Sequence, residues 1–180
     1  VSTTHHLYGN VCFWNFMSED ILVLIDWENL NLHCKNQRNE KVDLEALLNH
    51  AKTLGRVRHV LAFVGFMERS GDLVRILHRN GIEPRFTMTK QDLESKAIKN
   101  AADIHLAVTA MQFANTRPGI QSFLIVSGDQ GFLPLLRELK MYGRSVNILS
   151  MAEKNTIRQL AKEADSIAYY DDLVKPRGEE

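Results

Sequence analysis

Cysteine is scarce in this sequence of 180 residues, which contains only Cys12 and Cys34. The two residues form no CxxC pair, so neither a disulfide framework nor a zinc site built from thiolates is expected. They fit reduced thiols in a cytoplasmic protein. An excess of charge of one sign is also lacking, because 22 Lys and Arg residues balance 22 Asp and Glu residues. No overall basic field therefore attracts nucleic acid, and a polyanion would have to be held locally.

Long hydrophobic runs are absent as well. The apolar stretch from Val11 to Met17 is interrupted by Asn15, and the first basic residue is Lys35, so the N-terminus has neither a membrane span nor the charged start of a signal peptide. We expect a protein that is neither secreted nor membrane-spanning. Residues 1–19 are interpreted as a poorly ordered leader segment, residues 20–172 as one domain and residues 173–180 as a polar tail.

What the sequence does contain is a regular alternation of short apolar runs and helical patterns. Ile21–Ile25 and Phe123–Val126 are continuous apolar runs, typical of strands buried on both faces of a parallel sheet. Other strands are predicted at 60–64, 82–88, 146–149 and 167–170, and helices at 44–54, 71–80, 94–115, around 132–139 and at 156–164. This order predicts an α/β fold with a central parallel sheet of five to six strands flanked by helices in three layers.

Glycines and one apolar stripe add detail to the predicted helices. Gly55, Gly81 and Gly143 follow three of them and are expected to stop them. In the long helix at 94–115, apolar residues recur at helical spacing and predict the face that packs on the sheet. These residues are Ala97, Ala101, Ile104, Val108 and Met111.

Carboxylates follow two of the buried strands. Asp26 comes directly after the first strand, and Asp129 follows the fourth. Ligands of open α/β sheets bind beyond the carboxyl ends of the strands, and Asp103 on the long helix could point into the same crevice. Three carboxylates there would raise one another's pKa values unless a cation compensates. Oxygen ligands without a His or Cys set favour Mg²⁺ or Mn²⁺ over zinc.

Structural interpretations compete with this site. An Asp after a strand commonly forms a turn or caps a helix, and Asp103 could instead pair with Lys99 on the helix surface. The joint placement of Asp26 and Asp129 at two strand ends nevertheless favours a site. The seven histidines show no metal-binding spacing and are interpreted as structural or surface residues. No GxSxG, GxGxxG or Walker A sequence is present.

Polar neighbours of these carboxylates also have two interpretations. Asn29 could simply cap a helix, and Ser127 with Gly128 could form a tight turn or present backbone N–H groups to an anion. Basic residues in the edge loops and helix starts predict a rim that holds phosphates, although many such side chains are merely solvated. The rim consists of Lys35, Arg38, Arg69, Lys90, Lys96, Lys99 and Lys154, of which Lys90, Lys96 and Lys99 are the expected substrate contacts.

Three blocks of sequence resemble one known family, the NYN domains of the PIN-like nuclease superfamily, in particular its LabA-like (DUF88) branch. Ile25-Asp26-Trp27-Glu28-Asn29 is similar to the Asp-x-x-Asn block of the family. The second block spans Ala102–Val108 and is similar to the helical Asp block. The third spans Leu124–Asp129, followed by Phe132–Leu135, and is similar to the Ser-Gly-Asp block. The resemblance covers about residues 21–171.

The resemblance implies a PIN-like fold and a Mg²⁺- or Mn²⁺-dependent endoribonuclease acting on RNA, expected to be single-stranded. Asp26, Asp103 and Asp129 would be catalytic metal ligands, and Asn29 a supporting catalytic residue. Two positions that are often acidic in the family are Thr109 and Gly131 here, so a second metal is expected to bind weakly or not at all. The alternative is a catalytically weak RNA-binding or protein-binding regulatory module. A homodimer is compatible with either function.

Overall fold

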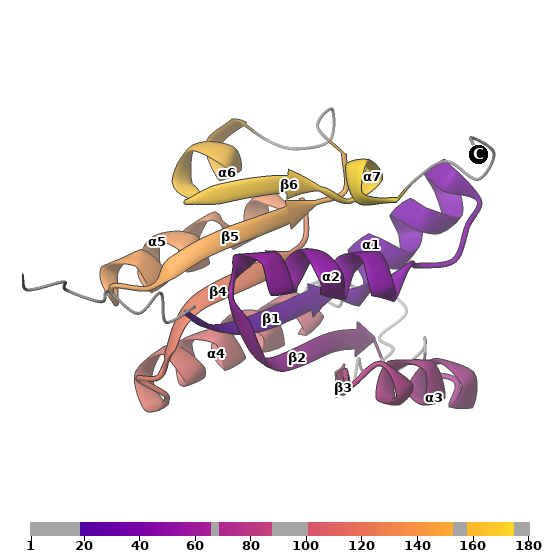
Figure 1. The fold of residues 1–180 in the computed structure, drawn as a ribbon, viewed down its shortest axis with the longest axis horizontal. Helices are drawn as coiled ribbons and strands as arrows, with labels where there is room; N and C mark the ends of the chain where they lie inside the picture. The colour runs from indigo at the N-terminus through magenta and orange to yellow at the C-terminus, as the bar shows by residue number, and fades with distance from the viewer. Residues whose placement is uncertain (1–18, 66–68, 88–100, 153–157, 175–180) are drawn as a thin grey trace, which may run out of the picture.

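The computed structural model describes residues 19–65, 69–87, 101–152 and 158–174. Within them, six parallel strands form one sheet in the order β3-β2-β1-β4-β5-β6, with helices on both faces (Figure 1). The predicted three-layer α/β fold with a parallel sheet is therefore confirmed, including its sixth strand. Within the described ranges, no helix combines the length and apolar content that crossing a membrane requires.

The elements follow one another as strand, helix, strand for most of the chain. The strands are β1 (Asp20–Asp26), β2 (Arg56–Gly65), β3 (Glu83–Thr87), β4 (Ile120–Val126), β5 (Ser145–Ser150) and β6 (Ser166–Tyr169). The α-helices are α1 (Trp27–His33), α2 (Leu44–Leu54), α3 (Gly71–Arg79), α4 (Ala101–Thr116), α5 (Leu133–Met141), α6 (Arg158–Glu163) and α7 (Tyr170–Leu173). Two irregular turns complete them: a π-helical turn η1 (Cys34–Arg38) and a 3₁₀ turn η4 (Gln130–Phe132).

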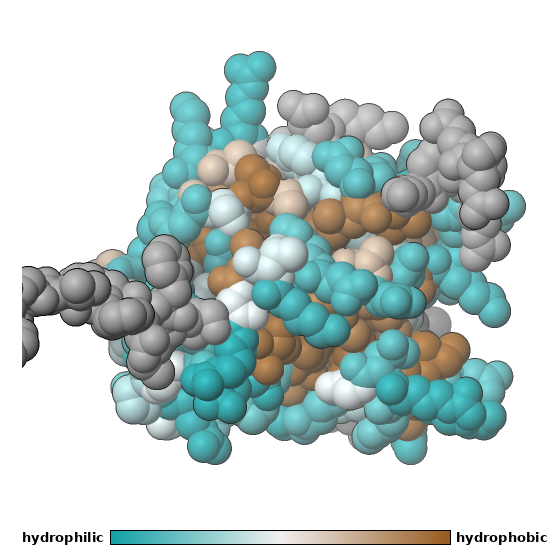
Figure 2. All heavy atoms as spheres, in the orientation of Figure 1, coloured by the Kyte–Doolittle hydropathy of each residue, from teal (hydrophilic) through white to brown (hydrophobic). Residues whose placement is uncertain are grey.

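Strand β1 lies in the middle of the sheet and carries apolar side chains on both faces. Ile21, Val23 and Ile25 pack in one core with α1, α2 and α3. Leu22 and Leu24 pack in the other core with α4, α5 and α6. Burial of each such side chain contributes about 1.5–3 kcal/mol. In the space-filling view, polar side chains cover the rim of the molecule and hydrophobic residues show between them at the centre (Figure 2).

Side-chain caps and glycines set the helix ends. The Asp43 carboxylate accepts a hydrogen bond from Ala46 N at 2.9 Å and caps α2. Gly81 and Gly143 follow α3 and α5 with φ of 69°, a left-handed conformation that glycine adopts without steric cost. Their predicted role as helix stops is confirmed.

The predicted buried face of α4 is wrong. Ile104 and Val108 are 63% and 61% exposed, whereas the helix packs on the sheet through Leu106, Ala110 and Ala114. Both stripes are apolar, so periodicity alone could not choose between them. The alanine stripe lets the helix backbone approach the sheet closely. Ala97 and the rest of the predicted helix before Ala101 lie outside the described residues.

Candidate active site

The candidate site begins at the carboxyl end of β1. This strand pairs in parallel with β4, with Ile25 opposite Val126, so the two strand ends lie side by side as predicted. Asp26 ends β1, is only 6% exposed and caps α1, because its Oδ1 accepts a hydrogen bond from Asn29 N at 3.1 Å. Asn29 therefore does not cap the helix. It is the third residue of the helix that Asp26 caps.

Ser127 joins the two strand ends through its buried hydroxyl group. Its Oγ donates to Asp26 Oδ2 at 2.9 Å and accepts from Asp129 N at 3.1 Å. Asp129 in turn caps η4, because its Oδ1 accepts from Gly131 N at 2.7 Å. Gly128 N points to Asn29 Oδ1 at 3.5 Å, a long contact. These contacts fix the backbone after β4 against the start of α1.

Asp103 lies in the first turn of α4 and interacts electrostatically with the carboxylates at the two strand ends. Burial raises the pKa of Asp26 to about 6, against the hydrogen bond from Asn29 N, and repulsion from Asp103 adds to the increase. Burial and repulsion from Asp129 raise the pKa of Asp103 above its ordinary value. Asp103 thus interacts with the carboxylates at both strand ends, and the three side chains share one electrostatic field.

Glu28 is a further acidic residue of this region that the sequence analysis did not select. It is exposed on α1, and its charge raises the pKa values of both Asp26 and Asp103. The available indication was its place in the Asp26-Trp27-Glu28-Asn29 block, two residues beyond the strand end. Its carboxylate increases the negative potential around the buried Asp26 side chain.

The basic rim is only partly visible. Lys90, Lys96, Lys99 and Lys154 lie outside the described residues. Lys35 is exposed on η1, whereas Arg38 forms ion pairs with Glu40 and Asp171, and Arg69 lies 5.4 Å from the centre of the Phe86 ring.

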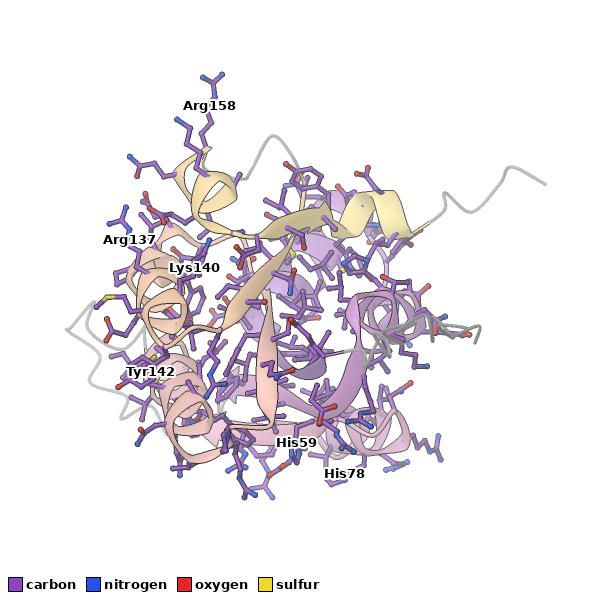
Figure 3. The ribbon with its side chains drawn as sticks, turned by 60° about the vertical axis from the view of Figure 1, so that its left-hand side comes forward. His59, His78, Arg137, Lys140, Tyr142 and Arg158 are labelled. Carbon is purple, nitrogen blue, oxygen red and sulfur yellow. The ribbon has the colours of Figure 1, made fainter. Side chains whose placement is uncertain are left out.

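Other basic side chains are engaged elsewhere. On α5, Arg137 pairs with Glu163 at 2.8 Å and Lys140 with Asp165 at 2.9 Å, so both are engaged with the end of α6 and the residues after it (Figure 3). The interactions that shift the pKa of Asp26 are its burial, two hydrogen bonds and the repulsion from Asp103 and Glu28, and none of them involves a basic side chain.

The donor set fits a hard cation that retains much of its water. Within the part of the chain that the structure describes, no three His, Cys, Asp or Glu side chains form a ready-made metal cage. Mg²⁺ does not require such a cage, because it commonly binds one or two carboxylates and completes its shell with water and substrate phosphates. If a cation of this kind binds, Asp26, Asp103 and Asp129 are the residues that would offer it carboxylate oxygens.

Thr109 and Gly131 differ in what they could add. Thr109 is 6% exposed in the layer between α4 and the sheet. Six residues separate it from Asp103, which corresponds to a rise of about 9 Å and a rotation of roughly 240°. An acid at 109 could not serve the same ion as Asp103. Gly131 lies beside the site, because a Cβ atom there would be 3.3 Å from Asp129 Oδ1.

Replacement of Ser127 by alanine should disturb the site more than the fold. The Asp26 carboxylate would lose a hydrogen bond that lowers its pKa, so we expect that pKa to rise above about 6. Loss of the buried hydroxyl group should also cost about 1–2 kcal/mol of stability. Carboxyl ¹³C chemical shifts followed against pH, together with urea denaturation, would measure both effects.

Ser122→Ala is the matched control for this prediction. Ser122 is a buried serine of β4, the strand that Ser127 follows, and its Oγ accepts a hydrogen bond from Asn147 Nδ2 at 2.9 Å. This variant should lose similar stability and leave the Asp26 pKa unchanged. Equal Asp26 pKa values in both variants would contradict the bridging role of Ser127.

Comparison with known proteins identifies the family. The profile of the NYN domain family matches residues 20–171, which is most of the chain. The chain belongs to the NYN domain family. All three blocks that resemble the family lie within this match, and so do Asp26, Asp103 and Asp129. No curated protein matches this NYN domain significantly in sequence.

Two solved structures resemble the NYN domain. A Vibrio parahaemolyticus protein of unknown function superposes with a TM-score of 0.74 and 21% sequence identity, covering 88% of this chain and 96% of the other. This likeness supports the same fold. The MAR1 ribonuclease from Caenorhabditis elegans superposes with a TM-score of 0.42 and 13% identity, covering 91% of this chain and 93% of the other.

Proposed function

We propose that this NYN domain is a Mg²⁺- or Mn²⁺-dependent endoribonuclease of the LabA-like (DUF88) branch that hydrolyses phosphodiesters in single-stranded RNA. One observation carries the proposal: the Asp26 carboxylate is buried beside other acidic groups, and burial and repulsion raise its pKa to about 6. A buried carboxylate near other acidic groups destabilises the folded state when it is ionised, and a bound divalent cation would offset this destabilisation. A cytoplasmic location and a homodimer belong to the same proposal.

The residues of the site would have distinct roles. Asp26, Asp103 and Asp129 would hold the metal ion, which when bound supplies an activated water and neutralises charge on the phosphate. Asn29 and Ser127 would keep Asp26 and Asp129 in place through the hydrogen bonds that they make. The N–H group of Gly128 and the rim residues Lys90, Lys96 and Lys99 would contact the substrate phosphates.

Incubation of the purified chain with mixed single-stranded and structured RNA in Mn²⁺ tests this proposal. Cleavage should require the metal, favour the single-stranded RNA and leave 5′-phosphates. EDTA should stop the reaction. Absence of cleavage over a range of Mn²⁺ concentrations, despite correct folding, would refute the hydrolytic function.

A regulatory binding module is the second candidate, because no three-ligand cage occurs among the described residues and Thr109 and Gly131 replace two acids. This candidate predicts RNA binding that survives EDTA and is followed by no turnover. The two candidates therefore differ in a single measurement made with and without metal.

Gly131→Asp should strengthen Mn²⁺ binding and increase cleavage. Residue 131 lies beside the Asp129 carboxylate, and Gly131 is not among the glycines with positive φ, so a side chain there requires only a small shift of the Asp129 carboxylate, whose Oδ1 would be 3.3 Å from the new Cβ atom. We expect an affinity increase of about threefold to tenfold, because charge count sets affinity for hard cations. Isothermal titration with Mn²⁺ and initial cleavage rates would measure it.

Gly131→Ala serves as the control, since it introduces the same Cβ contact with Asp129 without a charge. If both variants bind Mn²⁺ equally well, the missing carboxylate does not limit the site.

A further inference from the structure

A small cavity adjoins the acidic site. Its volume is about 230 Å³, and Asn29 and Gly128 form its boundary with the acidic site. Asn29 is the residue whose N–H group binds Asp26, and Gly128 lies between Ser127 and Asp129. A group bound in this cavity would therefore lie next to a phosphate held at the carboxylates. The volume is below the range of drug-sized pockets and suits a small planar group.

The lining of this cavity is neutral and polar at its edges. Asn29, Asn36 and Gln37 contribute amide groups, each able to donate and to accept hydrogen bonds. Leu32, which is 43% exposed, and Met151 contribute apolar surface. Among the lining residues that the structure describes, none is Asp, Glu, Lys or Arg. A phosphate would find no compensating charge here, whereas an uncharged ring with polar edges would find both apolar contact and hydrogen-bond partners.

An unusual backbone segment presents two of these amides. Asn36 and Gln37 belong to the π-helical turn η1, which ends at Asn39 with φ of 53°. π-helical turns are rare and occur often at functional sites. Asn39 ends the turn in a left-handed conformation that asparagine adopts readily, and its N–H group donates to Cys34 O. The turn places exposed amides at the cavity.

Buried polar contacts fix the position of the π-helical turn η1. His33, another lining residue, has a 5% exposed side chain, and its Nε2 lies 2.8 Å from Asp171 Oδ1. Arg38 Nη1 donates to the same oxygen at 3.2 Å. Since that carboxylate oxygen is an acceptor, Nε2 is assigned as the donor and the imidazole orientation is fixed. The cavity therefore has a rigid wall, as a site that recognises a shape requires.

We infer that this cavity binds one nucleobase of the RNA strand, beside the phosphate held at the carboxylates. The inference rests on the proposed function for the identity of the ligand, and it adds base preference to that function. Leu32 and Met151 would contact the face of the base, and Asn36 and Gln37 would bind its edge. Single-stranded RNA is commonly read in this way, with a base removed from its stack.

Binding of four RNA homopolymers to the full chain tests the inference. Fluorescence anisotropy would be measured in an Asp26→Asn background, which prevents cleavage. We expect one homopolymer to bind about tenfold more tightly than the weakest, a difference typical of one well-placed base. Gln37→Ala and Leu32→Ala should each reduce this preference to about twofold or less. Asn115→Ala, an exposed amide at the other end of α4, should leave it unchanged.

The outcomes separate the cavity from the catalytic proposal. Equal binding of all four homopolymers, or an equal weakening of all four by Gln37→Ala and Leu32→Ala, would overturn the inference. Metal-dependent cleavage by the unaltered chain, with no base preference at the cut site, would overturn the inference and leave the endoribonuclease proposal intact. Base-dependent binding without cleavage would support the inference and refute the endoribonuclease proposal. Failure to bind any homopolymer would refute both.

Discussion

Asp26→Asn should reduce Mn²⁺-dependent RNA cleavage by about a hundredfold or more, the scale expected when a metal site loses a ligand or its support. The substitution preserves shape and an oxygen that can still accept from Asn29 N, so the start of α1 should remain in place. What is lost is the negative charge at the most buried carboxylate of the site. Initial rates on single-stranded RNA, measured against Mn²⁺ concentration, would quantify the effect.

The same variant should also lose stabilisation by metal. A ligand that binds only the folded state raises the melting temperature with its concentration, so Mn²⁺ should raise that of the unaltered protein. The melting temperature of Asp26→Asn should respond much less. Asp72→Asn provides the control, because Asp72 is an exposed acid in the first turn of α3, far along the chain from the site. Unchanged cleavage in Asp26→Asn would rule out Asp26 as a metal ligand.

The second large effect concerns stability in the absence of metal. The folded-state pKa of Asp26 is about 6, against 3.8 for the unperturbed group. The folded protein therefore binds more protons than the unfolded chain between these pH values, and the free energy of unfolding falls as pH rises through them. The contribution of Asp26 should make the free energy of unfolding of the metal-free protein about 3 kcal/mol lower at neutral pH than at a pH below 3.8.

Urea denaturation in EDTA across this pH range would measure the effect as a difference between the unaltered protein and Asp26→Asn. The unaltered protein must be compared with Asp26→Asn because other titratable groups also change the free energy of unfolding with pH. Hydrogen bonds from Arg56 and Arg58 lower the pKa of Asp20, which gives a contribution of opposite sign. Parallel pH profiles for the two proteins would show that Asp26 is not a destabilising buried acid. Addition of Mn²⁺ should remove much of the slope at neutral pH.

The strands and the carboxylates at their ends were predictable from the sequence, because both depend on local patterns. A run such as Ile21–Ile25 has one plausible place in an α/β fold, and the residue after it must lie at the carboxyl edge. The neighbourhood of β1 and β4 followed from the topology of such sheets. The sequence alone therefore predicted an acidic group around Asp26.

The segment from Trp27 to Arg38 was not predictable in the same way. Its apolar residues at helical spacing are Trp27, Leu30 and Cys34, a stripe too short to show where the helix ends, and a π-helical turn has no sequence pattern of its own. Its conformation depends on partners distant in sequence, such as Asp171, which binds both His33 and Arg38. The neutral cavity beside the carboxylates was missed for this reason.

The bond between Ser127 and Asp26 also has a consequence for the order of events during synthesis. It joins residues 101 positions apart in the chain. A nascent chain that ends before β4 contains Asp26 and even Asp103 but cannot form the site. Whatever chemistry the crevice performs becomes possible only after the central pair of strands has closed. Activity of this domain thus reports completed folding, and truncated or stalled chains should be inert.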